Sequence, residues 1–525
     1  MSKIFTYQAK IDNADKIYDF LEDSASLFSK IERKLFAAHN KGCDIKKIKS
    51  EYISHFGINA RHFNSIRINL EGKIASSFAI RDNNIDETKN KITKTVNIIS
   101  KLKNKLKLTA NQANKSHQKR RLLASLKHKL SNLELDKTNN KIRICFGSKK
   151  LFNKQFNLEE NNYKEHTEWL QDWQKARDNQ FYLIGSKDET MGNQNCVATI
   201  NEDNNSINLR LRVPKNLETK YGKYILIENV KLNYGKDAVF SALNCNIKRN
   251  YLQKKNSKAL HGDLFKNYGQ AINYRFLKTE KDFKVFITVT KSAPQQESNK
   301  LFGSIGVDIN ANHLAVSEID NTGNLIKSFN VPLCTYGKSS AQSKALIGDA
   351  IKQIVAYAKI KQKPIIVEKL DFKKKKRALK EASPKYARML SSFSYSLILQ
   401  MLNSRAFRHG IEVFAVNPAY SSVIGRIKFC RIYKISVHQA AALVIARRFY
   451  RYSERLPYCW NNIPDNKGCH VALPKLVKIS GKHVWHLWAK VWKNLQAALA
   501  VQYQMNRQAK NSIGATGSLI EDIPF

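Results

Sequence analysis

Two short apolar segments in the last two-fifths of the chain each end in a single carboxylate, and this feature constrains the fold most. Residues 304–310, Ser-Ile-Gly-Val-Asp-Ile-Asn, place Asp308 near the end of an expected strand. Residues 364–368, Pro-Ile-Ile-Val-Glu, place Glu368 at the end of another. Because an apolar run buries itself in a sheet, an acid at its end lies at the rim, where it stays ionised. Two such acids on neighbouring strands form a minimal site for Mg²⁺ and a phosphodiester.

Each acid also has a simpler interpretation. Asp308 would merely start a turn with Asn310, and Glu368 would be a solvated charge before the basic run 373–377. The order of the segments favours the metal site instead. A Gly-x-Asp strand is followed by a second strand at 314–317, a turn at 321–324, a helix and the Glu-bearing strand. A basic run beside an acidic metal site would also draw in a phosphate backbone.

That order of segments resembles the layout of RNase H-like, or RuvC-like, nucleases. Residues 302–448 resemble the RuvC domain of transposon-encoded TnpB proteins and of the related type V CRISPR effectors. The stretch 417–422, Asn-Pro-Ala-Tyr-Ser-Ser, is similar to the Asn-Pro-x-Tyr-Ser/Thr-Ser stretch after the fourth strand of TnpB. Three alanines, 440–442, match the helix behind it. The resemblance covers the final 200 residues by motif and the first 300 by domain order.

The third catalytic position departs from the TnpB pattern. In TnpB-like proteins an Asp near the start of the final helix completes a carboxylate triad. Here that helix begins after Ser436, an expected N-cap, and the position is held by His438 or Gln439, depending on the register. Histidine ligates divalent ions or moves a proton, whereas neutral Gln is a poor Mg²⁺ ligand. Alternatively, His438 is a capping or packing residue with no catalytic role.

The cysteines depart from the family as well. TnpB usually carries two Cys-x-x-Cys pairs before its last helix, but residues 422–430 contain only Cys430. A four-ligand zinc site is therefore not available there, and we expect no structural zinc. The eight cysteines are scattered singly, and the sequence shows no signal peptide and no membrane-spanning apolar run. We therefore expect a prokaryotic cytoplasmic protein, without a membrane partner, that joins the nucleoid when bound to DNA.

Charge predicts the partner. The chain has 90 Lys and Arg against 43 Asp and Glu, a formal net charge of +47. A folded chain with this excess repels itself unless a polyanion neutralises it. One duplex contact neutralises only about 6–10 phosphates, so the excess indicates a long RNA, a heteroduplex or both. At 42% hydrophobic residues, the chain still has enough apolar surface to build cores.

The chain is predicted to be a multidomain protein of the α/β and α+β classes, with an RNase H-like nuclease domain. Helical spacing of apolar residues predicts two antiparallel helices joined near 111–114, and the segment between Lys91 and Lys129 has no acid. The family's order implies a β-barrel wedge domain interrupted by a helical recognition lobe. The expected boundaries are 1–12 for the first wedge strand, 13–140 for the lobe, 141–295 for the rest of the wedge, 302–510 for the nuclease with an insertion at 451–482, and 511–525 for a disordered tail.

The resemblance implies an RNA-guided DNA endonuclease that acts as a monomer on one guide RNA and cleaves double-stranded DNA beside a short duplex motif. Asp308 would bridge two Mg²⁺ ions, Glu368 would bind one, and His438 would complete the second site or protonate the leaving group. The main alternative is a guided DNA-binding protein with weak or no nuclease activity, because His438 or Gln439 replaces the third acid. An unguided RuvC nuclease would not need the large basic lobe.

Overall fold

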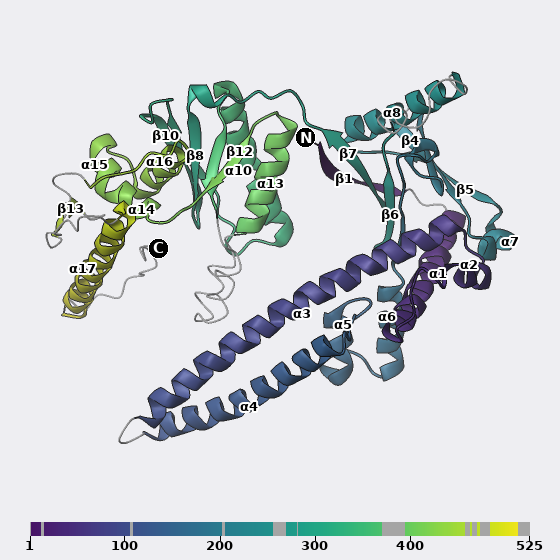
Figure 1. Cartoon of the computed structure of the whole chain (residues 1–525), viewed down its shortest axis with the longest axis horizontal. Coiled ribbons are helices and arrows are strands. Elements are labelled where there is room, and N and C mark those ends of the chain that lie inside the picture. The colour runs from purple at the N-terminus through teal and green to yellow at the C-terminus, as the bar shows by residue number, and fades with distance from the viewer. Residues whose placement is uncertain are drawn as a thin grey trace. The chain divides into compact units, whose positions relative to one another are not determined.

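A computed structural model describes residues 2–11, 15–104, 109–201, 205–255, 269–280, 282–369, 394–456, 462–464, 470–472 and 483–512 (Figure 1). The chain divides into two compact units, 1–292 and 293–525, which are described separately. The basic run 373–377, most of the expected insertion 451–482 and the tail from 513 onward lie outside the described residues. Among the described helices, none combines the length and the apolar character that crossing a membrane requires.

The first unit contains two long helices that pack as an antiparallel pair. Helix α3 (Ala60–Lys103) and α4 (Ala110–Thr138) are joined by ion pairs, with 2.9 Å from Lys89 Nζ to Glu134 Oε1. The predicted connection at 111–114 was wrong, because these residues already lie in α4. Thr109 and Gln112 form a capping box at the start of α4, in which each side chain bonds the other's backbone N–H. The pattern Thr-x-x-Gln is a helix start signal.

The first unit has two open antiparallel sheets. Strand order in the larger sheet is β1-β7-β6-β2, and β1 pairs with β7 along its whole length, from Ser2 opposite Ser292 to Ile11 opposite Phe283. The smaller sheet has the order β3-β4-β5. Among the described strands no closed barrel is seen, so the predicted barrel is not supported: β1 and β2 are the two outer strands of the larger sheet. The strands are β1 (Ser2–Ile11), β2 (Gln180–Leu183), β3 (Cys196–Asn201), β4 (Ser206–Arg212), β5 (Tyr224–Val230), β6 (Asn273–Lys278) and β7 (Phe283–Ser292).

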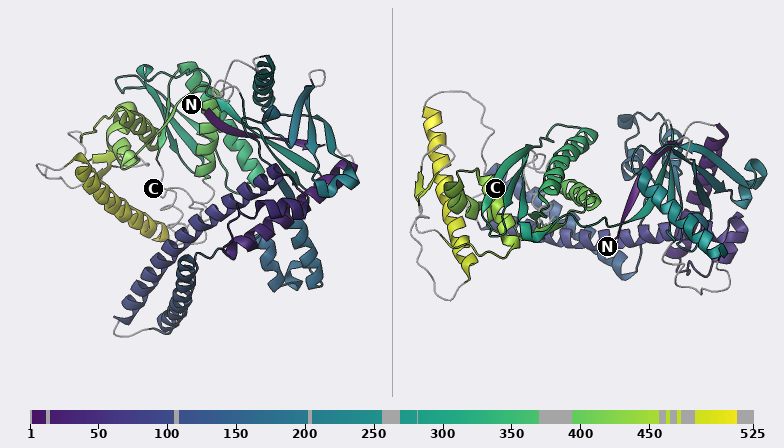
Figure 2. Two further views of the ribbon diagram at one scale, coloured as in Figure 1. Left: turned by 45° about the vertical axis from the view of Figure 1, so that its right-hand side comes forward. Right: turned by 90° about the horizontal axis from the view of Figure 1, so that it is seen from above.

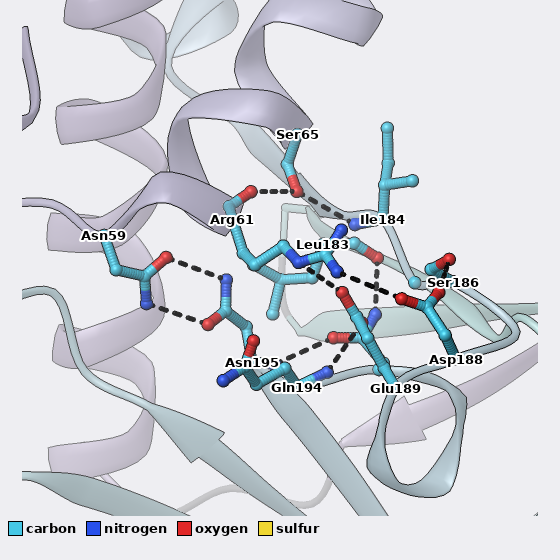
Figure 3. Close-up of polar contacts among 12 residues, drawn as sticks. Asn59, Arg61, Ser65, Leu183, Ile184, Ser186, Asp188, Glu189, Gln194 and Asn195 are labelled. Carbon is cyan, nitrogen blue, oxygen red and sulfur yellow. Dashed lines mark hydrogen bonds and ion pairs between the residues drawn. The ribbon is translucent and has the colours of Figure 1, made fainter. Parts of the chain in front are cut away.

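A polar network ties the start of α3 to the loop that follows β2 (Figure 3). Asn59 caps α3 and exchanges amide hydrogen bonds of 2.9 and 3.4 Å with Asn195. Arg61 Nε lies 2.5 Å from Oε1 of the buried Glu189. Further hydrogen bonds join Ile184 to Ser65 and Gln194 to Glu189. The remaining helices of this unit are α1 (Asp15–Asn40), α2 (Lys49–Phe56), α5 (Lys149–Asn153), α6 (His166–Arg177), α7 (Glu218–Tyr221) and α8 (Lys236–Lys255).

The second unit is built on a five-stranded mixed sheet in the order β10-β9-β8-β11-β12. Strands β8, β9 and β10 form antiparallel hairpins, and β11 runs parallel to β8 and β12. This is the predicted order of an acid-bearing strand, a returning hairpin, a helix and a second acid-bearing strand. The strands are β8 (Ser304–Ile309), β9 (His313–Ile319), β10 (Leu325–Pro332), β11 (Ile365–Glu368) and β12 (Val413–Val416).

Helices cover both faces of this sheet. On one face, Ile305, Val307 and Ile309 share a core with α10 (Ser340–Lys361) and α13 (Tyr395–Arg408). The alternate residues of β8 face α16 (Val437–Phe449), which packs against β8 and β9. The other elements in the described part of this unit are α14 (Ser421–Ile424), a short π-helix (Gly425–Phe429), α15 (Cys430–Tyr433), β13 (Asn462–Pro464), β14 (His470–Ala472) and α17 (Val484–Ser512), the yellow helix of Figure 2.

Gly306 lets α16 approach the sheet closely. A Cβ atom on Gly306 would lie 1.9 Å from the backbone oxygen of Ala442, far inside any allowed contact. Ala440, Ala441 and Ala442 are fully buried, so the small side chains of the helix complement the missing side chain of the strand. The Gly-x-Asp pattern therefore has a packing role for its glycine and brings the start of α16 next to the acid.

Candidate functional site

The two predicted acids lie level with each other on adjacent parallel strands. Strand β11 pairs with β8 in the register Ile365 to Ile305 and Val367 to Val307, so Glu368 follows in line with Asp308. Successive side chains of a strand point to opposite faces of the sheet. Val307 and Val367, the residues directly before the two acids, both belong to the core that includes α10. Both carboxylates therefore project from the α16 face, at the carboxyl ends of strands about 4.8 Å apart.

Asp308 is almost fully buried, with 6% exposure, and it has two neighbours that suit a carboxylate. Asn310 Nδ2 donates to Asp308 Oδ2 at 3.0 Å. His438 Nδ1 lies 3.5 Å from the same oxygen, and half of the His438 side chain is exposed. The structure thus brings together Asp308 and one of the two candidates from the final helix.

Gln439 is engaged at the start of α16. Its backbone N–H donates to Ser436 Oγ at 3.2 Å, and its side-chain Oε1 accepts from the backbone N–H of Ser436 at 3.2 Å. This reciprocal pair is a capping box, which satisfies two backbone donors that the helix itself cannot. Sequence reasoning identified Ser436 as the N-cap, but the Ser-x-x-Gln spacing would also have assigned the Gln439 side chain to this cap.

Glu368 contacts the loop 417–422, Asn-Pro-Ala-Tyr-Ser-Ser. Ser421, in the stretch 417–422, donates its hydroxyl to Glu368 Oε1 at 3.4 Å. Arg448 holds that loop by donating to the backbone oxygens of Asn417 and, at 2.9 Å, Ala419. Burial lowers the pKa of the Arg448 guanidinium, and the negative charge of Glu368 partly opposes this. The motif therefore forms one wall beside the second acid.

Tyr395 and His313 lie beside the candidate site, and the sequence analysis did not identify them. The Tyr395 hydroxyl donates to the Ile309 backbone oxygen at 3.3 Å, and burial, followed by Glu368 and Asp308, raises its pKa. The charges of both acids thus act on one hydroxyl. The ring of His313 contacts that of His438, and burial, then His438, lowers the pKa of His313 while Asp308 opposes this. No motif marks Tyr395; His313 lies only five residues after Asp308.

The donor set fits a hard divalent ion that keeps part of its water shell. Among the described residues, no three His, Cys, Asp or Glu side chains gather into a preformed metal cage. Mg²⁺ is commonly bound through only one or two carboxylates, with water and substrate phosphate completing its shell. Asp308 and Glu368, on the same face of adjacent strand ends, supply such a pair of carboxylates.

Comparisons with known proteins give weak structural likenesses. No protein-family model and no curated protein matches the sequence. The structure is similar to T. thermophilus RuvC in complex with a Holliday junction (18% identity, 28% of this chain and 93% of that chain, TM-score 0.21). It is also similar to Cas12f1 in a complex with sgRNA and target DNA (12%, 85% and 99%, 0.33) and to Cas12i1 in a binary complex with crRNA (11%, 89% and 55%, 0.25). With TM-scores this low, no functional conclusion follows from these likenesses.

Proposed function

We propose that this chain is an RNA-guided DNA endonuclease with a metal-dependent site on Asp308 and Glu368. The observation that carries the nuclease proposal is the placement of these two carboxylates, level with each other on one face of adjacent parallel strands. A buried acid such as Asp308 is costly unless a cation or hydrogen-bond donors compensate its charge. A divalent ion at the strand ends would supply that compensation.

Each residue has a chemical task in this proposal. Asp308 and Glu368 would hold Mg²⁺, which when bound polarises a phosphoryl oxygen and lowers the pKa of a water. Asn310 orients the Asp308 carboxylate through its 3.0 Å hydrogen bond. His438 is half-exposed beside Asp308, so its imidazole can complete the metal site or deliver a proton to the leaving oxygen.

The proposal of a guide RNA rests on charge. The net charge of +47 needs a polyanion, and the paired helices α3 and α4 offer a long basic surface for one. From Lys91 to Lys129, across the adjoining ends of these two helices, the sequence contains no acid. Phosphate contacts along this pair would neutralise the charge without reading sequence, which leaves target selection to base pairing.

We expect the protein purified at low salt to carry a long RNA, because its charge excess requires one. Absorbance at 260 and 280 nm, before and after RNase in high salt, measures the RNA content. Sequencing that RNA then supplies the guide, and duplex DNA that matches it should be cut in Mg²⁺, whereas a scrambled duplex should not. A stable preparation free of nucleic acid at low salt would refute guided function.

His438 and Gln439 are the two candidates for the third catalytic position, and each assignment predicts a different ranking of cleavage rates among the variants. We expect His438→Ala to reduce cleavage about as severely as Glu368→Ala, because His438 lies beside Asp308. Gln439→Ala should have a mild effect, since its side chain caps α16; loss of a cap costs about 1 kcal/mol of stability. Guided cleavage in Mg²⁺ and in Mn²⁺, which accepts nitrogen ligands more readily, measures both. If Gln439→Glu raises activity and His438→Ala leaves it unchanged, Gln439 holds the third position.

A guided DNA-binding protein that cuts poorly is the second candidate function. It is favoured by the side chain that faces Asp308, which is an imidazole and not a third carboxylate. Separate assays of DNA binding and DNA cleavage distinguish this function from the endonuclease. A protein that retains the matching duplex on a gel but leaves it intact in both Mg²⁺ and Mn²⁺ would support this candidate.

A further inference from the structure

His313 places a second imidazole next to the candidate metal site. It begins β9, and its ring lies 5.1 Å from the ring of His438, centroid to centroid, with the planes at 76°. His438 in turn lies 3.5 Å from Asp308. Two imidazoles and a buried carboxylate therefore follow one another at the carboxyl end of β8, although they come from three different elements.

The hydrogen bonding of His313 leaves one ring nitrogen with a free lone pair. Its Nδ1 lies 2.6 Å from Oδ1 of Asn312. A carboxamide oxygen can only accept, so Nδ1 carries the hydrogen and Nε2 of the neutral ring is an acceptor. Nε2 is buried and has no hydrogen-bond partner among the described residues. A buried acceptor is normally satisfied in proteins, and a water, an ion or another donor would satisfy this one.

We infer that His313 Nε2 is a nitrogen ligand, together with His438, for a divalent transition metal ion held at Asp308. This inference rests on the proposed function. Metal-ligating histidines usually donate their other ring N–H to an oxygen, which orients the ring, and Asn312 fills that role here. Because the described donors do not form a ready cage, the ligands would assemble as the ion binds.

Nitrogen ligands predict a shifted metal preference. Mg²⁺ favours oxygen donors, whereas imidazole suits later divalent ions of the first transition row. Compared with an all-carboxylate site of the same geometry, a site with two imidazoles would therefore favour Co²⁺, and to a smaller degree Mn²⁺, over Mg²⁺. This would explain how an acid can be replaced by His438 without loss of the metal.

Mn²⁺ binding tests the inference without relying on cleavage. The probe is Mn²⁺ added to the full chain with its co-purifying RNA, and electron spin-echo spectroscopy reports nitrogen coupled to the ion. We expect nitrogen coupling in the wild type, weaker coupling in His313→Phe, and a loss of Mn²⁺ affinity of at least about tenfold. Phe keeps a ring against His438 but lacks the nitrogen. His55→Phe, an exposed histidine of α2, is the matched control and should leave both readouts unchanged.

The outcomes separate this inference from the proposed function. If His313→Phe keeps the wild-type coupling and affinity, His313 is not a ligand, and the carboxylate site stands alone. If Asp308→Ala also binds Mn²⁺ as the wild type does, the proposed metal site itself is refuted. Should His313→Phe fail to fold, Asn312→Ala decides: lower affinity with retained nitrogen coupling supports the inference, and unchanged affinity overturns it.

Discussion

Asp308→Ala should reduce Mg²⁺-dependent DNA cleavage by on the order of 10³-fold or more, and Glu368→Ala should have a similar effect. A catalytic ion contributes several kcal/mol of charge stabilisation, and each 1.36 kcal/mol is worth a factor of ten in rate. RNA binding should change little, because it depends on many phosphate contacts elsewhere. Single-turnover cleavage of a matching duplex measures the first effect, and a filter-binding titration measures the second.

Asp349→Ala is the matched control for both acids. Asp349 is an exposed carboxylate on α10, on the helix that packs against the opposite face of the same sheet. Its removal changes the net charge by the same amount as loss of Asp308, so any general electrostatic effect appears in the control. Parental cleavage rates in both Asp308→Ala and Glu368→Ala would mean that the metal site is placed wrongly.

Gly306→Ala should destabilise the second unit and remove cleavage together with stability. The new Cβ would lie 1.9 Å from the Ala442 backbone oxygen and 3.0 Å from the Ala446 Cβ, and a backbone atom cannot turn away as a side chain can. Overpacking of this kind costs about 1–3 kcal/mol and sometimes more. Because α16 carries His438, displacement of the helix also separates His438 from Asp308. The midpoint of urea unfolding and the cleavage rate should fall together.

Gly348→Ala is the control for this substitution. Gly348 lies within α10, where the nearest atom to a new Cβ is the Met401 methyl carbon at 3.5 Å, an ordinary contact. Alanine is also favoured over glycine inside a helix by about 1 kcal/mol, so this variant should be as stable as the parent or more so. If Gly306→Ala unfolds at the parental midpoint, the close contact between α16 and β8 does not support the fold.

Local sequence patterns predicted the two acids of the candidate site. Asp308 and Glu368 each end an apolar run, and strand alternation alone places such acids at a sheet edge. The two acids lie level with each other because of the register between β8 and β11. Paired residues of these strands are 60 positions apart in sequence, so no local pattern predicts that register. The capping box of Ser436 and Gln439 was also readable locally, and it assigns Gln439 to the helix start.

The residues that were missed act through contacts between distant segments. Tyr395 reaches the site because α13 packs beside β8, and nothing in its neighbouring residues predicts this. His313 is close in sequence to Asp308, but its importance depends on His438, 125 residues later. In the first unit, the division of the described strands into two sheets depends on which strands pair with one another, and these pairings join segments far apart in sequence, such as β1 and β7.

The anchoring of α3 has a mechanical consequence. At about 1.5 Å per residue, its 44 residues form a rod about 66 Å long, and the network around Asn59 and Arg61 holds it at one end. On a lever of that length, a rotation of about three degrees at the root moves the tip by about 3.4 Å, the rise of one nucleotide along a strand. If the chain binds nucleic acid as proposed, a small change in the hydrogen bonds to Asn195 and Glu189 would move the basic end of α3 by about one nucleotide along the bound strand.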